Sequence, residues 1–226
     1  MSFCCLHGMS QQMRIYNGID ISHHNKVCWD SVLANRNIKF CYIKASEGVQ
    51  FLDPMARHHY QHAVGGNLYV GFYHYLRFDV SGKKQYSQFK RVLDSCPDYS
   101  LIPVVDVERG GNDISDTAQL NKVLRQFVQS FEADFGFRPI IYYCDYTPIK
   151  KVISHSEEYC KWVPRWRLSY VDSHIDIYQN FVSRIAGVPI DFDYCPDIDN
   201  ILLPKYLPCW HFDVVHHAVR VPTLRR

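Results

Sequence analysis

Residues 101–108 read Leu-Ile-Pro-Val-Val-Asp-Val-Glu, an apolar stretch that ends on two acidic side chains, Asp106 and Glu108. In residues 115–135, which follow, apolar side chains recur every three or four positions, the pattern of a helix with one buried face. Gly136 stands where a helix C-terminal cap is expected, and residues 139–143 form the next β-rich run. This strand–helix–strand order predicts parallel strands joined by a right-handed helical crossover.

The same alternation extends in both directions along the chain. Further short β-rich runs lie at residues 15–21, 40–44, 68–75, 162–166, 176–179 and 188–192. Helices are expected mainly after the first five runs, whereas the later connections are too short for full helices, so the last strands are expected to pair partly antiparallel. Eight such runs predict an α/β fold, an irregular TIM-like β/α barrel smaller than the roughly 250 residues typical of that fold.

Length and charge limit the class of protein. The chain has 226 residues, enough to bury one generous core, and we expect an N-terminal tail at residues 1–16, a barrel at 17–204 and a C-terminal extension at 205–226. Lys and Arg number 25 against 23 Asp and Glu, which argues against binding nucleic acid or anionic lipid by bulk electrostatics. No apolar run approaches the roughly 18 residues that a membrane-spanning helix needs.

The nine cysteines include no Cys-x-x-Cys pair, which disfavours a zinc ribbon or a redox motif. We expect most of them to be buried free thiols. The first residues lack the basic start and small-residue cleavage site of a secretory signal peptide.

Polar side chains stand at the ends of several runs. In parallel β/α folds the loops after the carboxyl ends of the strands converge on one face, where the chemistry takes place. Asp20 ends the first run, Asp106 and Glu108 end the fourth, and Asp191 ends the last. We therefore predict that these four carboxyl groups meet at one mouth of the barrel. The other strand ends would surround them with rings and polar groups, which are Tyr73, Tyr142, Trp166, Lys44, Glu47 and Gln179.

Asp106 and Glu108 are two residues apart, so on a strand both point to the same face. Two close carboxyl groups cannot ionise independently, and one of them holds its proton to higher pH than an isolated acid. A protonated acid beside a charged carboxylate is what glycoside hydrolysis needs. Glu108, with the longer side chain nearer the mouth, is predicted to be the general acid, and Asp106 the charged partner.

Simpler interpretations of the same residues remain open. Asp20 could cap the following turn, Lys44 and Glu47 could pair with each other, and His74 could be a core histidine. Alternatively, the four carboxylates together with His74 could hold a divalent cation. A serine nucleophile and a phosphate-binding loop are disfavoured, because the chain has no Gly-x-Ser-x-Gly and no glycine-rich loop with a suitably placed lysine.

Taken together and in order, six motifs resemble glycoside hydrolase family 25, the Chalaropsis-type lysozymes. The resemblance implies hydrolysis of the β-1,4 bond between N-acetylmuramic acid and N-acetylglucosamine in peptidoglycan, without a metal or another cofactor. It also implies that Glu108 is the general acid/base, that Asp106 stabilises or attacks the sugar, and that Asp20 and Asp191 line the site. Tyr73, Tyr142 and Gln179 match groove positions of the family. The motifs are residues 18–22, 43–48, 71–75, 103–108, 139–142 and 190–193.

The sequence departs from the family pattern at two places. His23 and His24 replace a Gln-Gly turn, and Asp193 replaces an asparagine, which adds negative charge beside Asp191. We expect a monomer that acts on peptidoglycan strands, either secreted or at the cell envelope. Two other functions stay open, a non-catalytic barrel that binds cell walls and a barrel hydrolase that is chitin-directed or metal-dependent.

Overall fold

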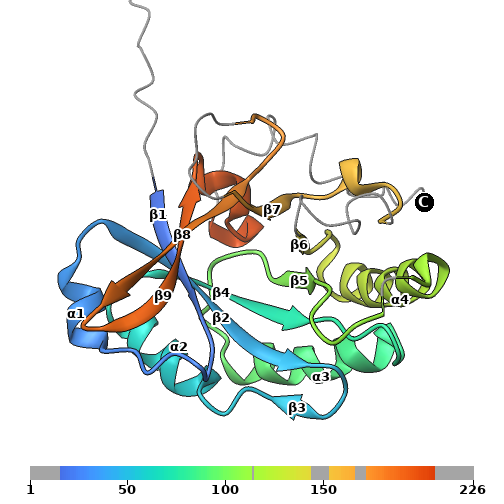
Figure 1. The fold of residues 1–226 in the computed structure, drawn as a ribbon, viewed down its shortest axis with the longest axis horizontal. Coiled ribbons are helices and arrows are strands. Elements are labelled where there is room, and N and C mark those ends of the chain that lie inside the picture. Colours follow the sequence, from blue (N-terminus) through green and yellow to red (C-terminus); the bar gives the residue numbers. More distant parts are fainter. Residues whose placement is uncertain (1–15, 114, 144–152, 166–171, 207–226) are drawn as a thin grey trace, which may run out of the picture.

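A computed structural model describes residues 16–113, 115–143, 153–165 and 172–206 of the chain (Figure 1). Its strands belong to one sheet, and its α-helices precede β6. The strands are β1 (Tyr16–Ile21), β2 (Ile38–Glu47), β3 (Phe51–Leu52), β4 (Tyr69–Tyr75), β5 (Val104–Val107), β6 (Ile140–Tyr143), β7 (Lys161–Pro164), β8 (Ile177–Ile185) and β9 (Val188–Cys195). The helices are α1 (Trp29–Ala34), α2 (Ala56–Gly65), α3 (Gly82–Ser95) and α4 (Thr117–Phe135), with short 3-10 turns η1 (Ser156–Glu158), η2 (Ile198–Ile201) and η3 (Pro204–Tyr206).

The sheet closes into a barrel because β1 pairs with β2 on one side and with β9 on the other. The order around the barrel is β1-β9-β8-β7-β6-β5-β4-β2, and β3 is a two-residue antiparallel addition to β2. Apart from β3, neighbouring strands are parallel from β1 through β8, whereas β9 runs antiparallel to both β8 and β1. The predicted eight-stranded irregular barrel, with antiparallel pairing confined to its last strands, is confirmed.

The helices cover one side of the barrel, as Figure 1 shows for α1, α2, α3 and α4. They follow β1, β3, β4 and β5 in the chain. Gly136 ends α4 with a positive φ of 76° and its N–H bonds to the Glu132 carbonyl, which confirms the predicted cap. The helix expected after the fifth run falls partly on residues 144–152, which lie outside the described part of the chain, and η1 follows them.

Large rings on β2 fill the barrel below its mouth. Phe40 and Tyr42 are fully buried, and in the register of the sheet Phe40 lies opposite Gly18 while Tyr42 lies opposite Gly71. A Cβ atom at either glycine would stand 2.2 Å from the ring it faces, so these two positions have room for hydrogen only. The next inward-facing positions along the same three strands are Asp20, Lys44 and Tyr73, which therefore lie one layer higher, at the mouth.

The described cysteines contain no disulfide; Cys41, Cys96 and Cys195 are buried free thiols, as expected, whereas Cys28 is exposed. Within the same ranges no helix is long and apolar enough to cross a membrane. Residues 1–15 and 207–226 lie outside the described residues, so the expected tail and extension stay predictions.

The contact between α3 and α4 depends on a glycine. A Cβ at Gly82 would lie 2.0 Å from the Val123 carbonyl oxygen and 2.8 Å from the Phe127 nitrogen, both backbone atoms that cannot turn aside. We expect Gly82→Ala to lower the free energy of unfolding by about 1–3 kcal/mol, the usual cost of overpacking. Urea unfolding followed by circular dichroism measures this change.

Gly65→Ala is the matched control, because a Cβ at this helical position meets nothing within 4 Å. It should change the stability by less than about 1 kcal/mol, the difference in helix propensity between the two residues. Equal stability of Gly82→Ala and the wild type would contradict the close approach of the two helices.

Candidate active site

A hollow of about 450 Å³ opens at the mouth of the barrel. All four predicted carboxyl groups line it, together with the predicted Lys44, Tyr73, Tyr142 and Gln179. Glu47 is absent from the lining but holds Lys44, and Trp166 lies outside the described residues. The other lining residues, which the sequence analysis did not select, are Ser22, His24, Tyr75, Trp162 and Pro164.

The missed residues follow the two-residue period of the strands. Tyr75 stands two positions after Tyr73, and Trp162 and Pro164 are two positions apart on β7. Side chains on alternate positions of a strand share a face, so this period could have identified them. Trp166 was selected instead because β7 was expected to reach it, whereas the strand ends at Pro164.

Asp191 reaches the mouth for a reason other than the predicted one. We expected it at the carboxyl end of the last run, but Asp191 lies in the first half of β9, which runs antiparallel to β1. Its Cα is paired with that of Asp20 on β1, so both carboxyl groups stand at the same height of the barrel. Because β9 runs antiparallel to β1, the early residues of β9 lie at the mouth of the barrel, and Asp191 is one of them.

Asp106 and Glu108 both line the hollow, and each carboxyl group shifts the pKa of the other. Asp106 is only 6% exposed, and its Oδ1 has no donor among the described residues. Burial, followed by the charge of Glu108, raises the pKa of Asp106 well above its ordinary value. Burial also raises the pKa of the more open Glu108, and Lys44 opposes both shifts. Both shifts favour a pair that keeps one proton between its two carboxyl groups, and the deeper burial of Asp106 favours that group as the holder in the free protein.

Lys44 is the cation of the hollow. Its Nζ donates to Glu47 Oε2 at 2.7 Å and lies 5.0 Å from the centre of the Tyr75 ring. Arg77 Nη1 approaches the other oxygen of Glu47 at 3.7 Å. The simple pairing of Lys44 with Glu47 is confirmed, and the same pairing fixes a positive charge close to Asp106 and Glu108.

A chain of hydrogen bonds holds Asp20 on the far side of the hollow. The Tyr142 hydroxyl donates to Gln179 Oε1 at 2.9 Å, and Gln179 Nε2 donates to Asp20 Oδ2 at 2.9 Å. Burial, followed by the charge of Asp191, raises the pKa of Asp20 to about 8. Tyr142 is 8% exposed and packs edge-on against Trp162, so it offers its hydroxyl to Gln179 rather than an open ring face to the hollow.

His74 does not belong to the site. It is fully buried on the outer face of β4, where its ring lies 5.2 Å from that of Phe127 on α4. Its Nδ1 bonds Ser46 Oγ at 2.8 Å and its Nε2 bonds Gln85 Oε1 at 3.1 Å. Burial lowers the pKa of His74 to about 4, so the ring is neutral. The interpretation as a core histidine is confirmed, and the cation site that included His74 is wrong.

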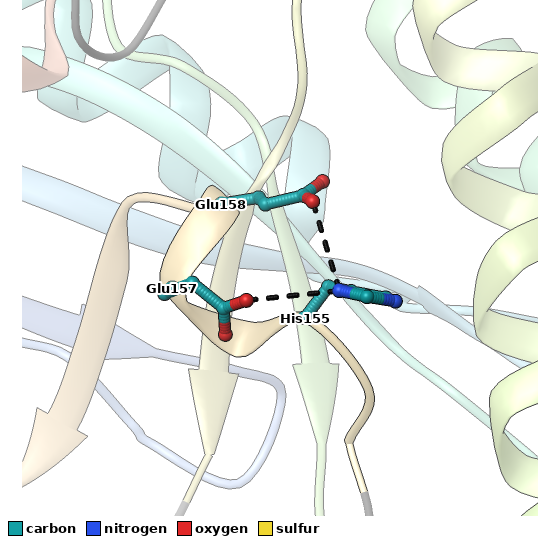
Figure 2. Close-up of side chains that lie close together, drawn as sticks. All are labelled: His155, Glu157 and Glu158. Atoms are coloured by element: carbon teal, nitrogen blue, oxygen red, sulfur yellow. Dashed lines mark ion pairs between the residues drawn. The ribbon is translucent and has the colours of Figure 1, made fainter.

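A separate group of possible metal ligands lies away from the hollow, at η1. His155 Nδ1 stands 3.6 Å from Glu157 and 3.8 Å from Glu158 (Figure 2). All three side chains are exposed, and Glu158 already pairs with Arg138. None of the three lines the hollow.

The raised pKa of Asp20 predicts a pH-dependent stability. A carboxyl group whose pKa is raised by folding contributes stability that is complete below its unfolded pKa and is lost as pH rises through its folded pKa. Between about pH 4 and pH 8 the free energy of unfolding of the wild type should therefore fall more steeply than that of Asp20→Asn, which cannot ionise. Urea unfolding at several pH values measures the two slopes.

Asp94→Asn is the control, because Asp94 is an exposed acid on α3 that pairs with Lys90. It should leave the slope at the wild-type value. If the slope for Asp20→Asn matched that of the wild type as well, Asp20 would not be a desolvated acid.

Comparisons with known proteins agree with the fold and with the motifs. The family model described as glycosyl hydrolases family 25 matches residues 19–185. The uncharacterised Escherichia coli K12 protein YegX is 30% identical over 156 residues, which cover 66% of this chain and 56% of YegX. A lysozyme of Streptococcus phage Cp-9 is 32% identical over 202 residues, 83% of this chain and 50% of that lysozyme. The chain thus spans about half the length of these curated relatives.

Solved structures share the architecture. A family 25 glycosyl hydrolase from Bacillus anthracis superimposes with a TM-score of 0.69 at 21% identity, covering 88% of this chain and 92% of that one. At this identity the likeness shows the fold, while the match of the family model spans most of the barrel. The chain therefore belongs to glycosyl hydrolase family 25.

Proposed function

We propose that the protein is a lysozyme-type hydrolase that cleaves the β-1,4 bond between N-acetylmuramic acid and N-acetylglucosamine in peptidoglycan. The observation that carries the proposal is the proton-sharing pair of Asp106 and Glu108 at the floor of an open hollow. Family membership and the relative that is named a lysozyme support the choice of reaction. The proposed substrate lies outside the cytoplasm, so the proposed place of action is the cell envelope or the surrounding medium, and the proposed form is a monomer.

The two carboxyl groups differ in access to the hollow, and this difference assigns their roles. Glu108 is the more open of the pair and is the group that a bound glycosidic oxygen would meet. A glycan that fills the hollow removes water from Glu108, which favours its neutral form. The shared proton then moves from Asp106 to Glu108 along their hydrogen bond, so Glu108 becomes the acid and Asp106 the charged partner.

Bond cleavage uses this arrangement directly. Glu108 gives its proton to the leaving oxygen as the bond to the anomeric carbon breaks, and positive charge develops on the sugar. Asp106 either stabilises this charge while the N-acetyl oxygen of the substrate attacks, or forms the bond to the anomeric carbon itself. Water then adds at the anomeric carbon and returns a proton to Glu108. Asp20 and Asp191 line the same hollow and, once ionised, add negative potential that also favours a cationic sugar.

A non-catalytic barrel that binds cell walls is the rival from another class. A site that only binds gains nothing from four crowded carboxyl groups, because desolvating like charges costs free energy. A chitin-directed or metal-dependent hydrolase is the other rival. Cleavage of chitin oligomers, or inhibition by a chelator, would favour this second alternative.

Replacement of the general acid tests the proposal. We expect Glu108→Gln to lower the rate of cell-wall clearing by about 10²- to 10⁴-fold, the usual contribution of a general acid. Loss of turbidity of purified sacculi, with chelator present, measures the rate, and mass spectrometry of the fragments should find muramic acid at the new reducing ends. Glu157→Gln is the matched control, since Glu157 is an exposed glutamate outside the hollow. Equal clearing by wild type and Glu108→Gln would refute the assignment.

Replacement of the charged partner should separate turnover from binding. Asp106 is buried beneath Glu108 and acts on charge that develops only during the reaction, so Asp106→Asn should lower kcat far more than it weakens glycan binding. Steady-state kinetics on solubilised glycan strands and pull-down with insoluble sacculi measure the two effects. A variant that lost binding but kept its turnover would contradict the role. Asp94→Asn again serves as the control on an exposed acid.

A further inference from the structure

Asp193 is a buried acid below the mouth. It is 2% exposed and is not among the residues that line the hollow. In the register of the sheet it lies opposite Gly18 on β1 and opposite Gln179 on β8. Its side chain is thus one layer below Asp20 and Asp191, inside the barrel, beside the glycine that leaves room there.

The contacts of Asp193 account for one of its oxygens but not for the other. Trp162 Nε1 donates to Oδ1 at 3.1 Å. Oδ2 is buried without a nitrogen or hydroxyl donor among the described residues. The Asp193 carboxyl group does, however, interact with that of Asp20, which contributes to raising the pKa of Asp193. Two carboxyl groups bond to each other only when one of them carries a proton.

The titratable groups around Asp193 oppose a negative charge on it, whereas the hydrogen bond from Trp162 favours one. These titratable groups are Asp20 on β1, Asp191 and Cys195 on β9, and Cys41 and Tyr42 on β2. No ion pair recorded for the described part of the chain reaches Asp20 or Asp193, and the neighbours that bond them, Trp162 and Gln179, are neutral. Burial and these acids raise the pKa of Asp193 well above its ordinary value. The same interaction acts to lower the pKa of Asp20, as expected for the acceptor of a hydrogen bond.

We propose that Asp193 is a positioning residue that works as a neutral carboxylic acid, donating a proton from Oδ2 to Asp20 and so holding the Asp20 carboxyl group in the hollow. Gln179 holds Asp20 from the other side, and Trp162 fixes Asp193 itself. The catalytic consequence rests on the proposed function, since it requires that Asp20 face the glycan. The protonation of Asp193 does not rest on it.

An acid at this position responds to pH, unlike an amide with the same hydrogen bonds. As pH rises, Asp20 ionises first, at its raised pKa of about 8, and then accepts the hydrogen bond as an anion. At higher pH Asp193 loses its proton as well, and two anions are left at bonding distance in a buried place. Their repulsion displaces Asp20. Asp193 thereby makes the placement of Asp20 dependent on pH, on the alkaline side of about pH 8, where the raised pKa of Asp20 lies.

Two substitutions of Asp193 separate its role as a hydrogen-bond donor from its ability to ionise. In Asp193→Asn the amide still donates to Asp20 and still accepts from Trp162, but it cannot ionise. Asp193→Leu removes both hydrogen bonds. Asp176→Asn is the matched control, because Asp176 is a half-buried acid just before β8 whose Oδ2 accepts from the Lys161 N–H, an acceptor that asparagine retains.

Activity on solubilised glycan strands is measured for each variant across pH. We expect kcat of Asp193→Leu to lie about 10- to 100-fold below that of Asp193→Asn, the cost of a lost hydrogen bond to a charged group, with a smaller change in KM. The ratio of wild-type to Asp193→Asn activity should be constant at acidic pH and should fall above about pH 8. Asp176→Asn should give no such pH-dependent ratio.

Infrared difference spectroscopy of the free protein tests the proton without any turnover. At neutral pH the spectrum of wild type minus Asp193→Asn should contain the carbonyl band of a protonated carboxylic acid. This band together with an inactive wild type would refute the proposed function and leave the protonated Asp193 standing. The absence of the band, or a wild-type to Asp193→Asn ratio that does not change with pH in an active enzyme, would overturn the proposal. The infrared band and the activity ratio compare only the wild type with Asp193→Asn, so both measurements remain decisive if Asp193→Leu fails to fold.

Discussion

The structure depends on how the inside of a narrow barrel is filled. Phe40 and Tyr42 occupy the interior, and they fit only because Gly18 and Gly71 on the neighbouring strands have no side chain. Since side chains alternate along a strand, the next inward positions are fixed as soon as these rings are in place. The layer above the rings is the first that water can reach, and it is there that Asp20, Lys44 and Asp106 stand.

Gathering ionisable groups in this poorly hydrated layer costs electrostatic free energy. Five acids gather at or just below the mouth, and Lys44, itself held by Glu47, is the cation that acts on the central pair. Burial raises the pKa of the most buried members, Asp106 and Asp193, well above its ordinary value, which favours their neutral forms and limits this cost. Crowding of this kind weakens the fold at neutral pH, and the stability has to come from the apolar layers below and outside.

Much of this arrangement follows from the sequence, but only where the determinants are local. The helix at residues 117–135, its Gly136 cap and the shared face of Asp106 and Glu108 depend on short-range periodicity, and they were predicted. The height of Asp191 and the depth of Asp193 depend on how β1 and β9 pair across the closed barrel, which no local pattern encodes. Trp162 was overlooked in favour of Trp166 because the end of β7 is set by tertiary contacts.

The pairing of β1 with β9 also has a consequence for folding. These strands lie at opposite ends of the described chain, so closing the barrel joins residues that are far apart in sequence, a slow and entropically costly step. Asp20 enters the site from the first strand and Asp191 from the last. A chain emerging from the ribosome therefore cannot assemble the complete mouth until its final strand has been synthesised, and partly made protein lacks one wall of the cleft.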